Sequence, residues 1–212
     1  MPTLESVWTL PYRILRKPLE LLPYFRFDRE TRFTQTPATI EAWISQNVFG
    51  RNRGPYWPVH PSSCVIGWRS ILVGIETSPG LMPGCYIQGI GEVQIGDYTQ
   101  IASNVGIISA NHDLHDSRVH HAERVEIGAY CWIGMGAVVL PGVTLGDFTI
   151  VGANSVVTKS FPDGYCVIAG NPAKKIRELD RSKCQRYTSP HEYHGFIKKD
   201  RFPQYRARYL HV

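Results

Sequence analysis

The sequence predicts an all-β solenoid, in which the chain turns after every short strand and successive coils stack. Aliphatic residues recur at a constant step of six, at Ile127, Ile133, Val139, Leu145, Val151 and Val157. A second run with the same step contains Ile95, Ile101 and Ile107. A period of six fits neither an amphipathic helix nor an alternating strand, and a coil that cannot bury its apolar face alone must stack on its neighbours. The 19 glycines and 15 prolines favour many turns.

Small residues accompany the aliphatic positions within each unit of six. Glycine directly follows the aliphatic residue at Gly128, Gly134, Gly146 and Gly152. The fourth position after it is compact in five units, at Cys131, Ala137, Val143, Thr149 and Ser155. Glycine relieves backbone crowding at a corner, so we expect one corner of the coil beside each aliphatic residue.

Residues 1–60 are expected to form a helical and irregular extension before the coils. Its first part is apolar at Val7, Trp8, Leu10, Ile14, Leu15, Leu19, Leu21 and Leu22. Prolines and charged residues interrupt this stretch, which argues against a signal peptide and against a membrane-spanning helix. We expect the segment to pack on the body of the protein, with peripheral contact to a membrane surface as the alternative.

A short helix is predicted over residues 37–49. Thr36 can cap its start, Pro37 suits its first turn and Gly50 suits its end. Its apolar stripe would consist of Ile40, Ile44 and Val48.

The coils are expected within residues 61–175, and the repeat is irregular in two places. Between residues 65 and 94, the aliphatic position is taken by Thr77, Pro83 and Gly89, so we expect distorted coils there. The separation of Ile107 and Ile127 exceeds a multiple of six by two positions. If residues 121–126 form a degenerate unit, then 113–120 is an insertion that loops outward, and loops on a rigid scaffold often carry sites.

The repeat resembles the hexapeptide-repeat acyltransferases, whose unit is aliphatic–Gly–x–x–small–x. The stretch from Val156 to Lys159, followed by that from Ala169 to Arg177, is similar to the closing signature of this family. The resemblance covers about 65 to 178 and implies a left-handed parallel β-helix, in which residues 127–162 make two full coils. It also implies a short helical N-terminal region, an extruded loop, a C-terminal tail over residues 176–212, and a homotrimer with active sites between subunits.

His112, at the start of the insertion, is the candidate general base. An unactivated hydroxyl attacks a thioester poorly, and histidine is the usual proton acceptor near neutral pH. The run from His112 to Leu114 resembles the His-Pro-Leu run of the maltose- and galactoside-type acetyltransferases, with Asp113 in place of proline. The candidate acceptor contacts are Asn111, Asp113, His115, Tyr86 and Gln88. The asparagine that the sugar acetyltransferases carry on an earlier coil has no counterpart around residues 83–89.

The resemblance also implies a groove for acetyl-coenzyme A, the donor. The groove residues carried over from the family are Trp132, Gly134, Met135, Ala153, Thr158 and Lys159, and Trp132 would wall the acetyl end. Lys174 and Arg177 would contact the phosphates, which suits their charge. Small residues such as Gly134 let a thin pantetheine arm approach the backbone.

Two other functions remain open at this point. Four closely spaced histidines, His112, His115, His120 and His121, could form a metal site, as in the γ-class carbonic anhydrases that share the same fold. The chain could also be a catalytically silent scaffold. Acetyl transfer to a hydroxyl, or an amino group, of a sugar or cell-surface polysaccharide precursor is the preferred prediction, and it needs no metal.

Charge and cysteine content bear on partners and location. Residues 174–212 carry eleven Lys/Arg against four Asp/Glu, whereas the rest of the chain carries twelve against fourteen. This basic tail could meet phosphate groups or a membrane surface, and we expect no nucleic-acid partner. The five cysteines are odd in number and contain no CxxC pair, which predicts reduced thiols and a cytoplasmic location.

Overall fold

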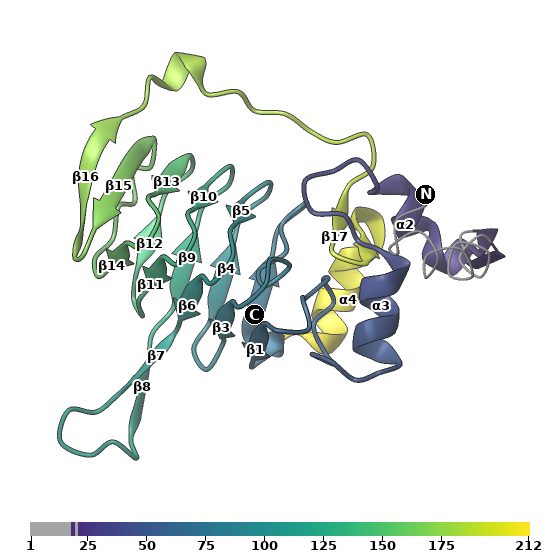
Figure 1. The fold of residues 1–212 in the computed structure, drawn as a ribbon, viewed down its shortest axis with the longest axis horizontal. Coiled ribbons are helices and arrows are strands. Elements are labelled where there is room, and N and C mark those ends of the chain that lie inside the picture. Colours follow the sequence, from purple (N-terminus) through teal and green to yellow (C-terminus); the bar gives the residue numbers. More distant parts are fainter. Residues whose placement is uncertain (1–17, 20) are drawn as a thin grey trace, which may run out of the picture.

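The computed structural model describes residues 18, 19 and 21–212 and shows three stacked sheets that the chain visits in rotation (Figure 1). The first sheet contains β1 (Cys64–Ile66), β3 (Tyr86–Gln88), β6 (Gly106–Ile108), β11 (Val138–Val139) and β14 (Val156–Val157). The second contains β2 (Ile71–Val73), β4 (Val93–Ile95), β9 (Val125–Ile127) and β12 (Thr144–Leu145). The third contains β5 (Gln100–Ile101), β10 (Trp132–Ile133), β13 (Thr149–Val151), β15 (Cys166–Gly170) and β16 (Ala173–Glu178). All pairings within these sheets are parallel except that of β15 with β16.

The step of six is confirmed as the period of the strands. Val138 lies opposite Val156 and Trp132 lies opposite Ile150, so each regular coil consists of three units of six. All nine aliphatic positions predicted to point inward are buried, and none of them is more than 8% exposed. No helix interrupts residues 127–157, as expected.

The corner glycines are required by close approach between coils. A Cβ atom on Gly134 would lie 2.6 Å from the carbonyl oxygen of Val151 and 2.7 Å from the amide nitrogen of Ala153, both in the next coil. Any larger residue at this corner would push the coils apart. Glycine at this corner therefore lets consecutive coils approach to the distance that strand pairing sets.

The early coils are longer than the later ones, and here the predicted phase needs correction. In the first sheet, Tyr86 lies opposite Cys64 and Gly106 lies opposite Tyr86, so these two coils exceed the regular one by four and two positions respectively. Ile107 therefore lies opposite Ile87 of the preceding coil, and not opposite Gly89 as a step of eighteen would place it. The inward aliphatic residue of that coil is present, but it is displaced by two positions.

The predicted loop 113–120 is part of a longer hairpin. β7 (Ala110–His112) pairs antiparallel with β8 (His120–Ala122), and the hairpin projects away from the coils (Figure 1). The partner of Gly106 in the next coil is Val138, so this coil is longer than a regular one by the whole hairpin. Residues 121 and 122 belong to the hairpin and not to a degenerate repeat unit.

The N-terminal part contains η1 (Pro23–Phe25), α2 (Arg26–Glu30) and α3 (Ile40–Asn47). α3 confirms a helix in the expected place, but it is shorter, and Thr39 caps it by accepting a hydrogen bond from the Ala42 amide. The expected cap Thr36 lies outside the helix because α3 starts three positions later than predicted. Ile40 is buried and Ile44 packs on the same small core, whereas Val48 is 61% exposed, so the predicted stripe packs except at its end.

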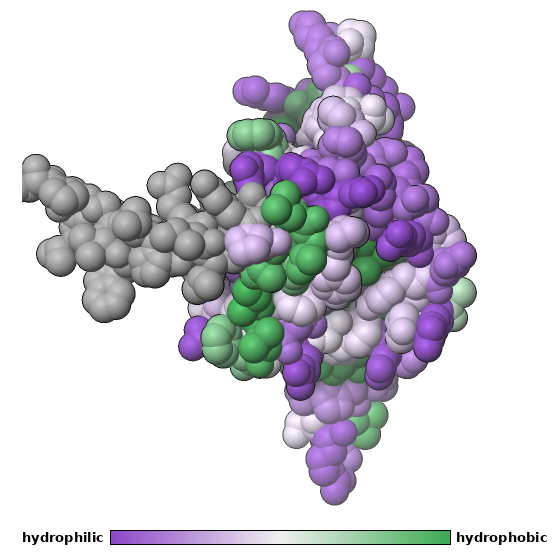
Figure 2. All heavy atoms as spheres, turned by 90° about the vertical axis from the view of Figure 1, so that its right-hand side faces the viewer, coloured by the Kyte–Doolittle hydropathy of each residue, from purple (hydrophilic) through white to green (hydrophobic). Residues whose placement is uncertain are grey.

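The expected packing of the apolar segment 7–22 falls mostly outside the described residues. Of the part that is described, the N-terminal region exposes Leu21, Leu22, Tyr24, Phe33, Val48 and Phe49. Figure 2 looks onto this end of the molecule and shows apolar surface gathered there. Within residues 18, 19 and 21–212, no helix is long and apolar enough to cross a membrane.

The basic C-terminal segment is an ordered return path and not a free tail. Residues 179–192, which we call the strap, run back along the coils to the N-terminal part (Figure 1). β17 (Tyr193–His194), β18 (Ile197–Lys198), η4 (Lys199–Arg201) and α4 (Phe202–Tyr209) follow there, while η3 (Arg181–Lys183) lies within the strap and η2 (Trp68–Ser70) within the first coil. Tyr193 packs with Phe25, Phe27 and Ile40, so both ends of the chain share a small second core.

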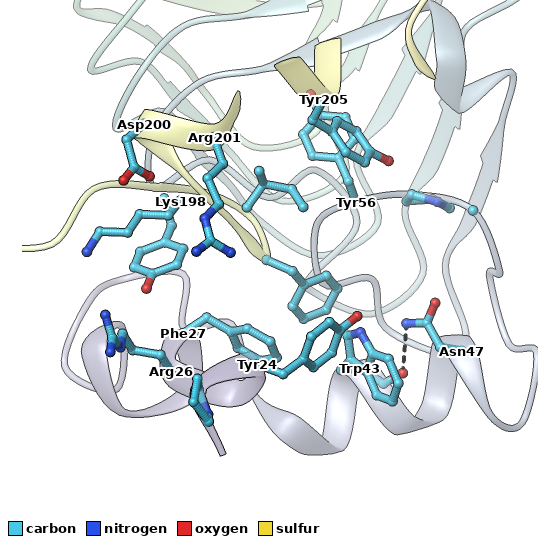
Figure 3. A pocket seen from close by; sticks show the side chains of 16 residues that line it. Tyr24, Arg26, Phe27, Trp43, Asn47, Tyr56, Lys198, Asp200, Arg201 and Tyr205 are labelled. Atoms are coloured by element: carbon cyan, nitrogen blue, oxygen red, sulfur yellow. Dashed lines mark hydrogen bonds between the residues drawn. The ribbon is translucent and has the colours of Figure 1, made fainter. Parts of the chain in front are cut away.

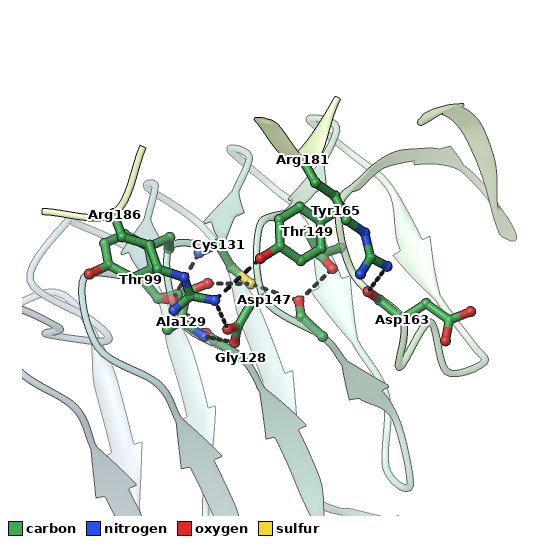
Figure 4. Close-up of polar contacts among 12 residues, drawn as sticks. Thr99, Gly128, Ala129, Cys131, Asp147, Thr149, Asp163, Tyr165, Arg181 and Arg186 are labelled. Carbon is green, nitrogen blue, oxygen red and sulfur yellow. Dashed lines mark hydrogen bonds and ion pairs between the residues drawn. The ribbon is translucent and has the colours of Figure 1, made fainter. Parts of the chain in front are cut away.

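An aromatic ladder fixes the strap on the coils, and Figure 4 shows its last ring, Tyr165, together with Arg181 and Arg186 of the strap. Tyr98, Tyr130, Phe148 and Tyr165 follow one another in successive coils with ring centroids 5.0–5.2 Å apart. The Arg186 guanidinium of the strap lies over two of these rings and forms an ion pair with Asp147 at 2.6 Å. Arg181 lies over the Tyr165 ring at 4.5 Å.

We predict that Ile107→Ala will destabilise the protein by about 2–5 kcal/mol, because it removes a fully buried side chain from a close-packed column. Ile66→Ala is the matched control in the same sheet, since Ile66 is 41% exposed, and it should change stability by no more than about 0.5 kcal/mol. Urea unfolding at one fixed protein concentration measures both. Equal effects would show that Ile107 does not carry the core packing assigned to it.

Candidate functional site

The hairpin that carries His112 is anchored at its base by Gln88. The Gln88 side-chain oxygen accepts a hydrogen bond from the Ala110 amide at 3.0 Å, and its carbonyl oxygen accepts one from the Ser109 hydroxyl at 2.5 Å. Gln88 sits on β3, one coil earlier than the hairpin. This contact fixes the direction in which the chain leaves the coil, two positions before His112.

His112 is exposed, and its ring is held on one side only. Its Nδ1 group donates to the Ser117 carbonyl oxygen at 2.5 Å across the hairpin. A carbonyl oxygen can only accept, so in the neutral ring this hydrogen bond selects the tautomer with the proton on Nδ1 and the lone pair on Nε2. The ring centroid lies 4.3 Å from that of His120, the residue opposite in the hairpin. His112 is therefore oriented as a hydrogen-bond acceptor with its Nε2 atom.

Asp113 shapes the tip of the hairpin. One carboxylate oxygen accepts the amides of His115 and Asp116 at 2.8 and 3.0 Å, and the other pairs with Nε2 of His121 at 2.8 Å. The His121 hydrogen bond and then the two amides lower the pKa of the Asp113 carboxyl to about 2. Both oxygens are occupied by the loop itself, so the structure gives Asp113 a positioning role.

The remaining candidate acceptor contacts lie around this hairpin. Asn111 precedes His112 on β7 and is exposed, and it lies opposite His121. His115 is exposed in the turn. Tyr86, on the same strand as Gln88, is 38% exposed. The four histidines do not converge: His112 faces His120, His121 is bound to Asp113, and among the described residues no three metal-binding side chains come together.

The predicted donor residues are spread over three regions of the prism. Gly134, Met135 and Ala153 lie together at the corner between the third and first sheets, where the Asn154 amide also bonds the Met135 carbonyl. Thr158 and Lys159 follow β14 at the corner between the first and second sheets. The hairpin leaves its coil at this same corner, after β6.

Trp132, Lys174 and Arg177 lie on the third sheet. Trp132 is 56% exposed while its neighbour Ile133 is fully buried, so the indole points outward. Lys174 and Arg177 are exposed on β16, where they pair with Ala169 and Val167. A corner between two sheets lies opposite the third sheet, so one protomer does not bring His112 and Trp132 together.

A separate hollow lies between the two ends of the chain and contains none of the predicted site residues (Figure 3). Its volume is about 560 Å³. Aromatic side chains such as Trp43 and Tyr205 line it together with Arg26, Lys198 and Arg201. Arg26 and Lys198 are both within 4 Å of the Glu30 carboxylate, which offsets part of their charge.

The residues that position the candidate base could not be identified from the amino-acid sequence. Ser117 accepts the hydrogen bond with its main-chain carbonyl oxygen. Every residue has this group, so the residue type at position 117 gives no sign of the contact. The aromatic ladder did leave a signal, because Tyr130 and Phe148 are one coil apart and each stands two positions after a corner glycine.

Comparison with known proteins places these features in a family. Residues 124–159 match the family described as bacterial transferase hexapeptide (six repeats). The chain is 34% identical over 153 residues to WcaF of Escherichia coli (strain K12), which bears the name of a putative colanic acid biosynthesis acetyltransferase; the match covers 66% of this chain and 82% of WcaF. It is 42% identical over 96 residues to the galactoside O-acetyltransferase of Escherichia coli (strain K12), covering 43% of this chain and 47% of that enzyme.

A solved structure matches nearly the whole chain. The structure of a galactoside acetyltransferase in complex with coenzyme A superposes with a TM-score of 0.56 at 25% identity, covering 92% of this chain and 100% of the other. By sequence alone, the chain spans only about half the length of the galactoside O-acetyltransferase.

We predict that the carboxyl of Asp113 titrates near pH 2, below its usual pKa of 3.8, when followed by NMR. Because the folded pKa is depressed, the ordered turn is fully present above the usual carboxyl pKa and is lost as the pH falls through about 2. At neutral pH, Asp113→Asn should weaken the turn and speed hydrogen exchange at the His115 and Asp116 amides. Unchanged exchange rates at these amides would refute the positioning role.

Proposed function

The chain belongs to the bacterial hexapeptide-repeat transferase family, and we propose that it transfers the acetyl group of acetyl-coenzyme A to a hydroxyl group of a sugar or polysaccharide precursor. The observation that carries this proposal is the orientation of His112. Its Nδ1 proton is engaged by the Ser117 carbonyl, which leaves Nε2 free to accept a proton from an acceptor hydroxyl.

The reaction then needs only one proton shuttle. Nε2 of His112 takes the hydroxyl proton as the acceptor oxygen attacks the thioester carbonyl carbon. Hydrogen-bond donors stabilise the negative charge on the carbonyl oxygen of the tetrahedral intermediate. The carbon–sulfur bond breaks, and the proton on Nε2 passes to the departing thiolate. An amino acceptor would follow the same course, and no metal takes part in it.

The donor would lie along the corner formed by Gly134, Met135 and Ala153. Small residues at this corner let the pantetheine arm approach the backbone. Thr158 and Lys159 are proposed as further contacts along the arm. Lys174 and Arg177 are exposed and positively charged, as phosphate contacts require. The similarity of this chain to a galactoside acetyltransferase in complex with coenzyme A supports this assignment.

We further propose a left-handed coil and a homotrimer whose active sites lie between protomers. The family supports the left-handed coil, and the support for shared sites is geometric, because the hairpin of His112 and the outward face of Trp132 lie on opposite sides of one prism. Cyclic association brings the corner of one protomer against the third sheet of the next. His112 of one copy and Trp132 of another then border the same groove.

The five cysteines support a reducing compartment, and we assign the enzyme to the cytoplasm. All five are free thiols, and Cys85, Cys131 and Cys166 are buried. Burial raises the pKa of the Cys131 thiol to about 12, so it remains protonated and inert.

We expect His112→Ala to lower turnover by about 10²–10⁴-fold, the usual contribution of a positioned general base. The affinity for coenzyme A should be nearly unchanged, because no donor contact is removed. His115→Ala is the control in the same exposed turn and should cost much less. Steady-state acetyl transfer to a panel of sugars measures turnover, and calorimetry measures donor affinity. Near-normal turnover of His112→Ala would rule out this residue as the base.

We expect inactive variants to complement each other in mixed trimers. His112→Ala and Trp132→Ala should each be nearly inactive alone. After unfolding and refolding together in equal amounts, about a quarter of the interfaces should combine an intact His112 with an intact Trp132 from the neighbouring copy. Recovery of activity to that level supports a shared site. Light scattering on the same samples reports the assembly, and a trimer without recovered activity would contradict a site shared in this way.

A further inference from the structure

A pocket of about 410 Å³ lies between the third sheet and the strap. This volume falls in the range of roughly 300–1,000 Å³ that small-molecule sites occupy. Its aromatic lining consists of Tyr98, Tyr130, Trp132, Phe148 and Tyr187. None of the residues that line it carries a charged side chain. Burial raises the pKa of the Tyr98 and Tyr187 phenols, so both stay neutral at physiological pH.

Three glutamines supply the polar groups of this pocket. They are Gln35, from the N-terminal part, Gln100, from β5, and Gln185, from the strap. Gln35 donates to the Tyr187 hydroxyl at 3.3 Å. The Nε2 atom of Gln100 is buried and has no hydrogen-bond partner among the described residues. A buried donor without an acceptor is unfavourable, and a turn of the Gln100 side chain toward the pocket would let a ligand oxygen accept from it.

Gln100 and Trp132 are neighbours on one face. They lie opposite each other in the pairing of β5 with β10, and paired strands are about 4.7–4.9 Å apart. The Trp132 indole is 56% exposed and offers a flat apolar surface beside the amide. An aromatic platform next to amide groups, without formal charge, suits the apolar face and hydroxyl groups of a neutral sugar ring. It does not suit a phosphate.

The strap forms one wall of this pocket, through Gln185 and Tyr187. The Tyr130 hydroxyl donates to the Tyr187 carbonyl at 2.7 Å. The preceding strap residue, Arg186, is held on the coils by its ion pair with Asp147 (Figure 4). The Asp147 hydrogen bond raises the pKa of the Arg186 guanidinium further, so the pair stays charged. This wall is therefore held in place before any ligand enters, which lowers the entropic cost of binding.

We infer that the pocket under the strap is a subsite for a neutral sugar ring of the acceptor, stacked on Trp132 and hydrogen-bonded by Gln100. The inference rests on the proposed function for its link to catalysis, because Trp132 would also border the acetyl end of the donor. The sugar bound here lies beside the transferred group. The binding itself requires no donor and can be measured alone.

The test measures binding of methyl glycosides of glucose, galactose and mannose to the intact protein by ligand-observed NMR and calorimetry, without donor. At least one glycoside should bind the wild type. Gln100→Leu keeps the size of the side chain and should weaken that binding about tenfold, the effect of losing one good hydrogen bond. Its melting temperature should be unchanged or higher, because the unsatisfied donor is gone. Its affinity for coenzyme A should be unchanged.

Two further variants keep the test decisive. Trp132→Leu removes an exposed ring without disturbing the core and should also weaken sugar binding. Arg186→Ala frees the strap beside the pocket and should do the same, whereas Arg181→Ala, which removes a strap cation stacked on Tyr165, is the control and should not.

The outcomes separate the subsite from the enzyme activity. Unchanged glycoside affinity in Gln100→Leu and Trp132→Leu overturns the subsite, as does a loss of coenzyme A affinity in Gln100→Leu, which would assign the pocket to the donor. Acetyl transfer by a wild type that binds no glycoside also overturns the subsite but leaves the proposed function standing. Glycoside binding without any acetyl transfer supports the subsite and removes the proposed function.

Discussion

The whole molecule depends on closing each coil around three faces, most of which are formed by short strands. Each strand offers only one or two inward aliphatic side chains, too few for a coil to fold alone, and stability comes from stacking one coil on the next. Stacking in turn requires that corners carry no bulk where coils touch, which is why a Cβ at Gly134 would collide with the backbone at Ala153. Because the inward positions are fully committed to the column, they are not available for chemistry. Function has to come from outward positions and from departures from the period.

The largest departures sit at the corners of the prism. The hairpin of His112 leaves where the first sheet meets the second, and Gln88 of the preceding coil ties down its base. Bulky residues occupy the corners along the aromatic ladder. Their backbones adopt positive φ angles between 47° and 58°, at Tyr98, Tyr130, Phe148 and Tyr165. Bulky residues rarely accept this backbone region, and they persist only where the surroundings over-determine them. Ring stacking and the strap's cations supply that constraint, so the same ladder that strains the corners attaches the C-terminal segment.

The periodic part of the fold was predictable because an aliphatic residue recurs at every sixth position of the sequence. Ile127 and its successors had to point inward once the chain was recognised as coiled. The early coils were harder, since a shift of two positions places Ile87 inward instead of Gly89, and coil length follows from turn geometry that residue type does not show. His112 could be singled out by chemistry and position, but its orientation depends on the Ser117 carbonyl, which any residue would provide. The strap was read as a basic tail because its contacts join residues far apart in sequence, such as Arg186 and Asp147.

Outward positions of paired strands stand in register, and this places distant residues side by side in a predictable way. Gln100, Trp132 and Ile150 occupy one outward row of the third sheet, although they are contributed by three different coils. None of the three points into the column, so a change at any of them leaves the inward packing intact. A chain of this kind can therefore change what it binds by altering one row while the inward column stays the same. The buried amide of Gln100 is informative for this reason: stacking does not require it, and an apolar side chain would leave no unsatisfied donor at that position.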